Sequence, residues 1–130
     1  MSPCMKLFNH VQIKVKDLDS SQKFYDAIME VLGYPTVLEI DKKVIGYGTD
    51  VHDMFEICQA DKKAVPSGPV HVAFNASSME VVDDFYRTAI QQGAQCNGAP
   101  GFCPEYEEGY YAAFVIDLDG HNIEAVYKVK

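Results

Sequence analysis

The feature that most constrains the fold of this chain is an internal repeat. Asn9-His10-Val11 is followed by Phe24-Tyr25, and Val70-His71-Val72 is followed by Phe85-Tyr86. The two histidines are 61 residues apart (71 minus 10), and so are the two Phe-Tyr pairs (85 minus 24). Two copies of about 60 residues are too short for a solenoid, so the repeat predicts two similar modules packed together.

The first copy is expected to contain a strand, a helix and three further strands. Apolar and polar side chains alternate over residues 8–16, which is the period of a half-buried strand. Asp19-x-x-Gln22 resembles a capping box at the start of a helix, and Gly33 is a typical stop after the helical apolar stripe. Turn-forming residues then separate three short strands, expected at 36–40, 44–48 and 53–58.

The second copy repeats this order. A strand is expected at residues 70–75, Ser77-x-x-Glu80 resembles a second capping box, and Gly93 follows the second helical stripe. Three further strands are expected at 95–98, 110–117 and 121–127. Both copies therefore predict a βαβββ unit, which makes the fold class α+β with mixed sheets.

Length and composition predict one compact domain over residues 1–130. The chain is 48% hydrophobic, which is enough to build a core without disulfides. Residues 59–69 are polar and rich in helix and strand breakers. We interpret them as the linker between module one, at about 7–58, and module two, at about 70–128.

Charge and patterning argue against a nucleic acid or a membrane as partner. The chain has 11 Lys plus Arg and 19 Asp plus Glu, a net charge of -8, which repels phosphate backbones and anionic membrane surfaces. No stretch of about 18 apolar residues could span a bilayer, and the N-terminus lacks a secretory signal pattern. The cysteines form no C-x-x-C motif, so we interpret them as reduced thiols of a cytoplasmic protein: Cys4, Cys58, Cys96 and Cys103.

Two histidines and two glutamates occupy duplicated positions. His10 and His71 lie at the start of each copy, and Glu56 and Glu124 lie in the apolar run that ends each copy. Their apolar neighbours point to the opposite face of each strand, so all four fall on the face that the helices leave uncovered. Two imidazoles and two carboxylates suit a divalent metal ion such as Zn, Ni, Mn, Fe or Co. A single His or Glu there is usually solvated, but the duplicated register favours a ligand cluster.

Further polar side chains are candidates for binding a small-molecule substrate. Gln12 and Lys14 share the predicted face with His10, and Asn75 shares it with His71. Since Arg87 is the only arginine, the remaining cationic options of the chain are lysines, and Lys14 is one of them.

Segment 99–111 is long, aromatic and acidic. It is either a lid that brings Tyr106 and Tyr111 to a substrate or an ordinary solvated loop. Cys58 is either a soft ligand or a small buried side chain. His52 and His121 lie outside the repeat and beside turn residues, so we expect both at the surface.

These motifs resemble the vicinal oxygen chelate superfamily, which includes glyoxalases, bleomycin-resistance proteins and extradiol dioxygenases. The resemblance covers about residues 8–127, and it implies that the two modules form halves of a curved barrel around a divalent metal. It also implies a homodimer with shared sites, in which His10 and Glu56 of one chain meet the partner's His71 and the partner's Glu124. The strongest marks of the resemblance are Asn9-His10-Val11 with Lys23-Phe24-Tyr25, Val70-His71-Val72-Ala73-Phe74, and Asp119-Gly120-His121-Asn122-Ile123-Glu124.

The ligand count that the resemblance implies favours one branch of this chemistry. Four protein ligands suit an isomerase or lyase of the glyoxalase I type, in which Glu124 or Glu56 moves a proton. Extradiol dioxygenases use two His and one carboxylate on iron, so that alternative needs His10, His71 and Glu124 with Glu56 unbound. A drug-binding protein like the bleomycin-resistance members is a further alternative, although such binders tend to lack metal ligands. Arg87 is the only arginine, which argues against recognition of glutathione carboxylates.

Overall fold

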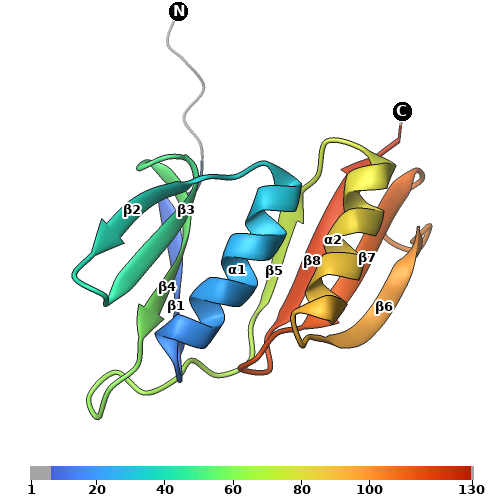
Figure 1. The fold of residues 1–130 in the computed structure, drawn as a ribbon. Helices are drawn as coiled ribbons and strands as arrows, with labels where there is room; N and C mark the ends of the chain where they lie inside the picture. Colours follow the sequence, from blue (N-terminus) through green and yellow to red (C-terminus); the bar gives the residue numbers. More distant parts are fainter. Residues whose placement is uncertain (1–6, 130) are drawn as a thin grey trace, which may run out of the picture.

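The computed structural model describes residues 7–129, which form two four-stranded sheets and two helices (Figure 1). The strand order is β1-β4-β3-β2 in the first sheet and β5-β8-β7-β6 in the second. The predicted α+β class and the two βαβββ modules are therefore confirmed. The elements are β1 (His10–Val15), α1 (Leu18–Leu32), β2 (Thr36–Ile40), β3 (Val44–Asp50), β4 (Asp53–Gln59), β5 (His71–Asn75), α2 (Met79–Gln91), β6 (Gln95–Phe102), β7 (Tyr110–Ile116) and β8 (Asn122–Lys128).

Both sheets use the same strand register. β1 runs parallel to β4 with Gln12 opposite Glu56, and β5 runs parallel to β8 with Ala73 opposite Glu124. Ala73 lies 61 residues after Gln12 (73 minus 12), the same offset as the two histidines. The repeat in the sequence is therefore also a repeat in strand pairing, and it brings each His onto the strand that neighbours its Glu.

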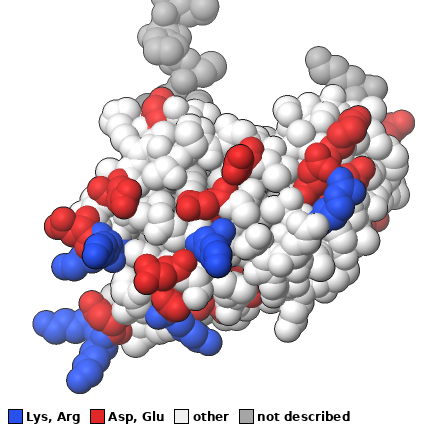
Figure 2. All heavy atoms as spheres, in the orientation of Figure 1, with Lys and Arg blue, Asp and Glu red and all other residues white. Residues whose placement is uncertain are grey.

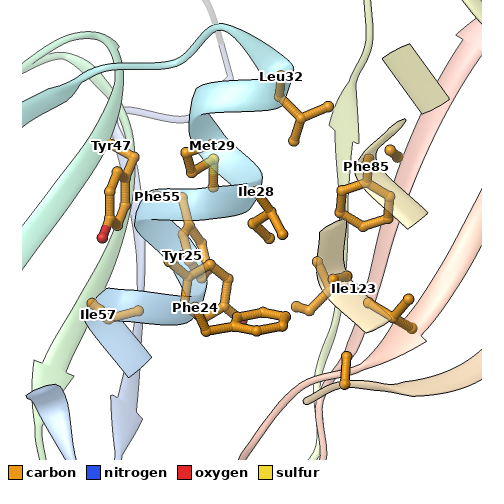
Figure 3. Packing of buried hydrophobic residues seen from close by; sticks show 14 of the residues in the cluster. Phe24, Tyr25, Ile28, Met29, Leu32, Tyr47, Phe55, Ile57, Phe85 and Ile123 are labelled. Atoms are coloured by element: carbon orange, nitrogen blue, oxygen red, sulfur yellow. The ribbon is translucent and has the colours of Figure 1, made fainter. Parts of the chain in front are cut away.

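One continuous apolar core joins the two modules. Figure 3 shows that side chains of α1 lie between Tyr47 and Phe55 of the first sheet on one side and Phe85 and Ile123 of the second module on the other. Phe55 also packs edge to face against Phe74 of β5, with ring centroids 5.1 Å apart. Burial of this shared apolar surface is the main force that holds the modules together.

The helices start near the predicted capping boxes but not at them. α1 begins at Leu18 instead of after Asp19, because Leu18 is buried and its backbone N–H donates to Gln59 Oε1 at 2.9 Å. α2 is capped by Ser78 rather than by Ser77. The start of α1 is set by the hydrogen bond between Leu18 and Gln59 of β4. The start of α2 is set by Ser78, whose side chain caps the helix in place of the adjacent Ser77.

Segment 99–111 is not one long loop. β6 continues to Phe102 and pairs with β7, which begins at Tyr110. The prediction of a loop over all of residues 99–111 is therefore wrong, because both ends of this segment belong to strands. β6 is the edge strand of its sheet, and an edge strand accepts Pro100 and register shifts because only one of its sides must pair. The connecting loop is limited to residues 103–109.

The surface over the helices carries interspersed charges, with acidic and basic side chains close together (Figure 2). Arg87, for example, pairs with Asp84 on α2. In residues 7–129, no helix is long and apolar enough to cross a membrane. Cys58, Cys96 and Cys103 are free thiols, as predicted, and Cys4 lies outside the described residues.

Candidate metal and substrate site

Glu124 is the centre of a polar cluster in module two. It lies on β8 between Ile123 and Ala125, whose side chains enter the core, so its own side chain points to the other face. Glu124 is nevertheless only 2% exposed. Its Oε1 lies 2.7 Å from His71 Nε2, and its Oε2 accepts a hydrogen bond from the hydroxyl of Tyr110. Both carboxylate oxygens therefore have a fixed partner.

Aromatic rings form one wall of this cluster. Burial and the Glu124 carboxylate raise the pKa of Tyr110, so its phenol remains a hydrogen-bond donor at neutral pH. The Tyr106 ring packs edge to face against Tyr110 with centroids 5.3 Å apart, and its centroid lies 6.4 Å from that of Phe114. Phe114 in turn lies 6.1 Å from the His71 ring. Tyr106 of the predicted substrate-binding set therefore lies close to the Glu124 cluster.

Module one holds an equivalent but more polar cluster around Glu56. Glu56 is 5% exposed, and its Oε1 accepts a hydrogen bond from Gln12 Nε2 at 2.8 Å. Gln12 in turn accepts from Lys14 Nζ. The His10 ring does not join this chain, because its Nδ1 lies 2.8 Å from Asn9 Oδ1.

A small residue lies opposite each carboxylate on a neighbouring strand. On β3, Gly46 lies opposite Glu56, and a Cβ there would lie 2.9 Å from Met54 Sδ and 3.5 Å from Glu56 Cγ. In module two, Ala73 leaves Glu124 open to His71, whereas Gln12 fills the equivalent place beside Glu56. This exchange of an amide for a methyl group gives a physical reason why the imidazole reaches the carboxylate in only one module.

The two clusters lie on separate sheets. Within the described part of the chain, no three His, Cys, Asp or Glu side chains gather around one point. His10 and Glu56 belong to the first sheet, and His71 and Glu124 belong to the second. One chain therefore offers two pairs of potential ligands and not a closed set of four.

A cavity of about 430 Å³ lies between the modules beside His71. Val11, Met54 and Phe74 give it apolar walls, and Asn75 of the predicted substrate-binding set lines it as well. Asn75 also accepts a hydrogen bond at its backbone carbonyl from the Tyr34 hydroxyl, at 2.7 Å. The cavity joins surfaces of both modules and is large enough for a small molecule.

Tyr111 is not part of this arrangement. It is next to Tyr110 on β7, so its side chain points to the opposite face, where its hydroxyl donates to Asp83 of α2 at 2.6 Å. This hydrogen bond raises the pKa of Tyr111 to about 12. The geometry does not support the predicted role of Tyr111 in binding a substrate. Sequence reasoning missed Tyr110, although strand alternation could have selected it once β7 was assigned.

His121 is a second correction, because it is fully buried and not at the surface. Its Nδ1 accepts a hydrogen bond from the Val70 backbone N–H at 3.1 Å, which fixes the proton on Nε2. The turn before it packs on module one, where Asp119 accepts from the Lys16 backbone N–H and Asp117 accepts from the Tyr25 hydroxyl. His52, by contrast, is exposed as predicted.

Two sheets with this strand order and a duplicated register define the paired βαβββ class of α+β proteins. Residues 7–125 match the sequence family described as the Glyoxalase/Bleomycin resistance protein/Dioxygenase superfamily. The chain belongs to this superfamily. Among proteins with curated annotation, none matches the sequence.

Solved structures agree with this assignment. A glyoxalase/bleomycin resistance protein from Albidiferax ferrireducens T118 is 30% identical with a TM-score of 0.79, over 95% of this chain and 100% of that chain. A glyoxalase/bleomycin resistance protein/dioxygenase family enzyme from Burkholderia phytofirmans PsJN is 18% identical with a TM-score of 0.72, over 93% and 98% of the two chains. A lactoylglutathione lyase from Agrobacterium tumefaciens is 18% identical with a TM-score of 0.65, over 96% and 95%. The last two similarities concern the fold alone.

Proposed function

We propose that this protein is a divalent-metal-dependent enzyme resembling glyoxalase I, which catalyses isomerase- or lyase-type proton transfer on a small oxygenated substrate. The observation that carries the proposal is a pair of buried carboxylates, Glu56 at 5% and Glu124 at 2% exposure, in equivalent positions of the two modules. We also propose that it acts in the cytoplasm, where the thiols of Cys58, Cys96 and Cys103 stay reduced.

The chemistry of these residues fits a metal cation. Burying a carboxylate is costly unless a positive charge or several hydrogen bonds compensate it. In residues 7–129, neither Glu56 nor Glu124 has a Lys or Arg ion-pair partner, and each has a histidine two strand positions away on the same face. His10, Glu56, His71 and Glu124 would hold an ion such as Zn, Ni, Mn, Fe or Co.

We propose that the complete site forms between two chains. The two ligand pairs lie on different sheets, and β1 and β5, which carry the histidines, are both edge strands. In a homodimer, His10 and Glu56 of one chain would join the partner's His71 and the partner's Glu124. This arrangement explains why the ligands form pairs within one chain.

The residues around the pairs define what the protein can do with a substrate. A divalent metal, when bound, would polarise adjacent substrate oxygens and make a neighbouring C–H more acidic. Glu56 or Glu124 would accept that proton and return it to a neighbouring carbon. The apolar cavity beside His71 would exclude water, and the polar groups proposed to orient the substrate are Gln12, Lys14, Asn75 and Tyr106.

Extradiol-type oxygenation is a second candidate, and one specific contact favours it. The Gln12 amide already occupies one oxygen of Glu56, so Glu56 could stay off the metal and leave His10, His71 and Glu124 as a facial triad. A non-catalytic drug-binding function is a third candidate, which the apolar cavity of about 430 Å³ favours.

Metal-free protein titrated with Zn, Ni, Mn, Fe and Co in turn would test the proposal. We expect about one ion per site by calorimetry and elemental analysis, with binding abolished in His71→Ala and retained in His52→Ala. The metal-loaded protein would then be assayed with methylglyoxal plus glutathione, with other hydroxycarbonyl compounds and with catechols. Oxygen consumption with Fe and a catechol would favour the dioxygenase. Tight binding of an aromatic drug without any metal binding would favour the third candidate and overturn the enzyme.

A further inference from the structure

We propose that Tyr110 is a positioning residue that orients the Glu124 carboxylate for binding the metal through the oxygen facing His71. The inference rests on the proposed function, because it concerns the same ligand pair. It adds a residue that lies outside the duplicated His and Glu set.

The first observation is how the two oxygens of Glu124 are used. Oε1 lies 2.7 Å from His71 Nε2, and Oε2 accepts the Tyr110 hydroxyl. Tyr110 keeps Oε2 occupied, whereas the imidazole that faces Oε1 would itself be a ligand and would no longer bind Oε1 through a proton once its Nε2 holds a metal. We therefore infer that Glu124 would bind the metal through Oε1 alone, which is the oxygen that faces the His71 imidazole.

The second observation is that the backbone fixes the position of Tyr110. Gly109 has a φ of +81°, and a Cβ there would lie 2.3 Å from the Val129 carbonyl oxygen. Only glycine fits this close approach of the two backbone segments. A 2.8 Å hydrogen bond from the Val129 N–H to the Gly109 carbonyl holds the segments together, and β7 begins at the next residue, Tyr110. The Tyr106 ring then packs on the Tyr110 ring at 5.3 Å. The Tyr110 phenol is thus positioned by the backbone at Gly109 and by an edge-to-face contact with Tyr106, independently of its hydrogen bond to Glu124.

The third observation is the contrast with module one. Glu56 accepts from the neutral amide of Gln12, which is an exposed side chain, and no tyrosine hydroxyl contacts it among the described residues. A hydrogen bond from a phenol inside a nearly buried cluster holds a carboxylate more firmly than one from an exposed amide. Within the proposed site, Glu124 is therefore the fixed ligand and Glu56 the carboxylate that is freer to move.

A pair of matched variants tests this role. Tyr110→Phe and Tyr111→Phe each remove one hydroxyl that donates to a carboxylate, from neighbouring residues on opposite faces of β7. Both proteins would be titrated with Zn²⁺ in competition with a chelator and with Co²⁺ while its visible absorption spectrum is recorded. Thermal unfolding of the metal-free proteins would report any general loss of structure.

We expect Tyr110→Phe to weaken Zn²⁺ and Co²⁺ binding about 10- to 100-fold and to change the Co²⁺ spectrum, as loss of a residue that orients a ligand usually does. Tyr111→Phe should keep its affinity for both ions within about threefold of the wild-type affinity, even if its melting temperature falls as much as that of Tyr110→Phe. Equal metal affinities and equal Co²⁺ spectra in the two variants would overturn the role of Tyr110 while leaving the proposed function intact. Failure of the wild type itself to bind either ion would overturn both.

Discussion

Gln12 occupies in module one the position that Ala73 occupies in module two, each directly opposite a buried glutamate on the neighbouring parallel strand. This one exchange separates the two halves of the candidate site. The amide of Gln12 binds Glu56, whereas the methyl group of Ala73 leaves Glu124 accessible to an imidazole. The duplicated strands thus carry the same acid in two different surroundings.

Replacing Gln12 tests whether this amide orients Glu56. Gln12→Ala removes a 2.8 Å hydrogen bond to a nearly buried carboxylate, so we expect the free energy of unfolding to fall by about 1 kcal/mol and metal affinity to fall about tenfold. Urea denaturation and Zn²⁺ titration would measure the two effects. Gln95→Ala, at an exposed position of β6, is the control. Equal metal affinity in the two variants would show that Gln12 does not act through Glu56.

Mixing two inactive variants tests whether the site is shared between chains. One variant carries His10→Ala and Glu56→Ala, and the other carries His71→Ala and Glu124→Ala. In the proposed dimer, either variant alone would lack part of every site, but a mixed dimer would contain one site with all four ligands. The two variants would be dissociated, mixed and allowed to reassociate. We expect metal binding and activity to return in the mixture, with at most one intact site per mixed dimer.

The same experiment has a clear contrary outcome. If each site is built within one chain, no mixture of these two variants can contain a complete set of ligands. Mixed dimers that form, as shown by mass spectrometry of differently tagged chains, and still bind no metal would contradict the shared site.

The buried phenol of Tyr25 predicts how stability depends on alkaline pH. Burial, followed by the nearby Asp117 carboxylate, raises the pKa of Tyr25 well above its ordinary value of 10.0. Above pH 10 the unfolded phenol ionises while the folded one does not, so stability falls as pH rises, by up to about 1.4 kcal/mol per pH unit for this group. Below pH 10 this group contributes no dependence on pH.

Urea denaturation between pH 8 and pH 11 would measure this slope. Tyr25→Phe should lose stability at pH 8, because Asp117 loses a 2.5 Å hydrogen bond, but its curve should be flatter above pH 10 than that of the wild type. Tyr106→Phe, which removes an exposed phenol, should keep the wild-type slope. A parallel decline of all three proteins would assign the alkaline effect to other groups.

His121 predicts a large structural effect from a histidine outside the candidate site. His121→Ala leaves a cavity in a fully buried place and removes the acceptor for the Val70 N–H, so we expect a loss of about 2–4 kcal/mol in the free energy of unfolding. His52→Ala, at an exposed position, should change it by less than about 0.5 kcal/mol. Metal affinity per folded molecule should be unchanged in both variants, which separates this effect from that of His71→Ala.

The repeat made the fold predictable because strands and helices of this length follow from local periodicity. Glu56 and Glu124 could be placed on one type of face from their apolar neighbours alone, and the strand register agrees with that placement. Sequence periodicity describes single strands, however. It could not show that β6 pairs with β7 on both sides of Pro100, across a register shift, because that pairing depends on a partner strand.

The burial of His121 and the direction of the Tyr111 side chain could not be predicted, for the same physical reason. His121 follows a turn, which suggests exposure, but the turn packs on the junction of β1 and α1 through Asp119. Tyr110 and Tyr111 are adjacent residues of the same type, and only the orientation of β7 in the sheet shows which side chain points to Glu124. Tertiary contacts decided both cases, with module one for the turn before His121 and with other elements of module two for the two tyrosines, and such contacts leave no mark in a local pattern.

The exchange of Gln12 for Ala73 also has a stereochemical consequence. If both modules had kept the same residue, the proposed shared site would be close to two-fold symmetric in its polarity, and a substrate would meet similar groups on either side. As the chain stands, one side offers an amide and a lysine, and the other offers the rings of Tyr106, Tyr110 and Phe114. The two sides of the proposed site would therefore distinguish the two ends of an unsymmetrical substrate and favour one binding orientation, which sets the face of the substrate that a given carboxylate meets.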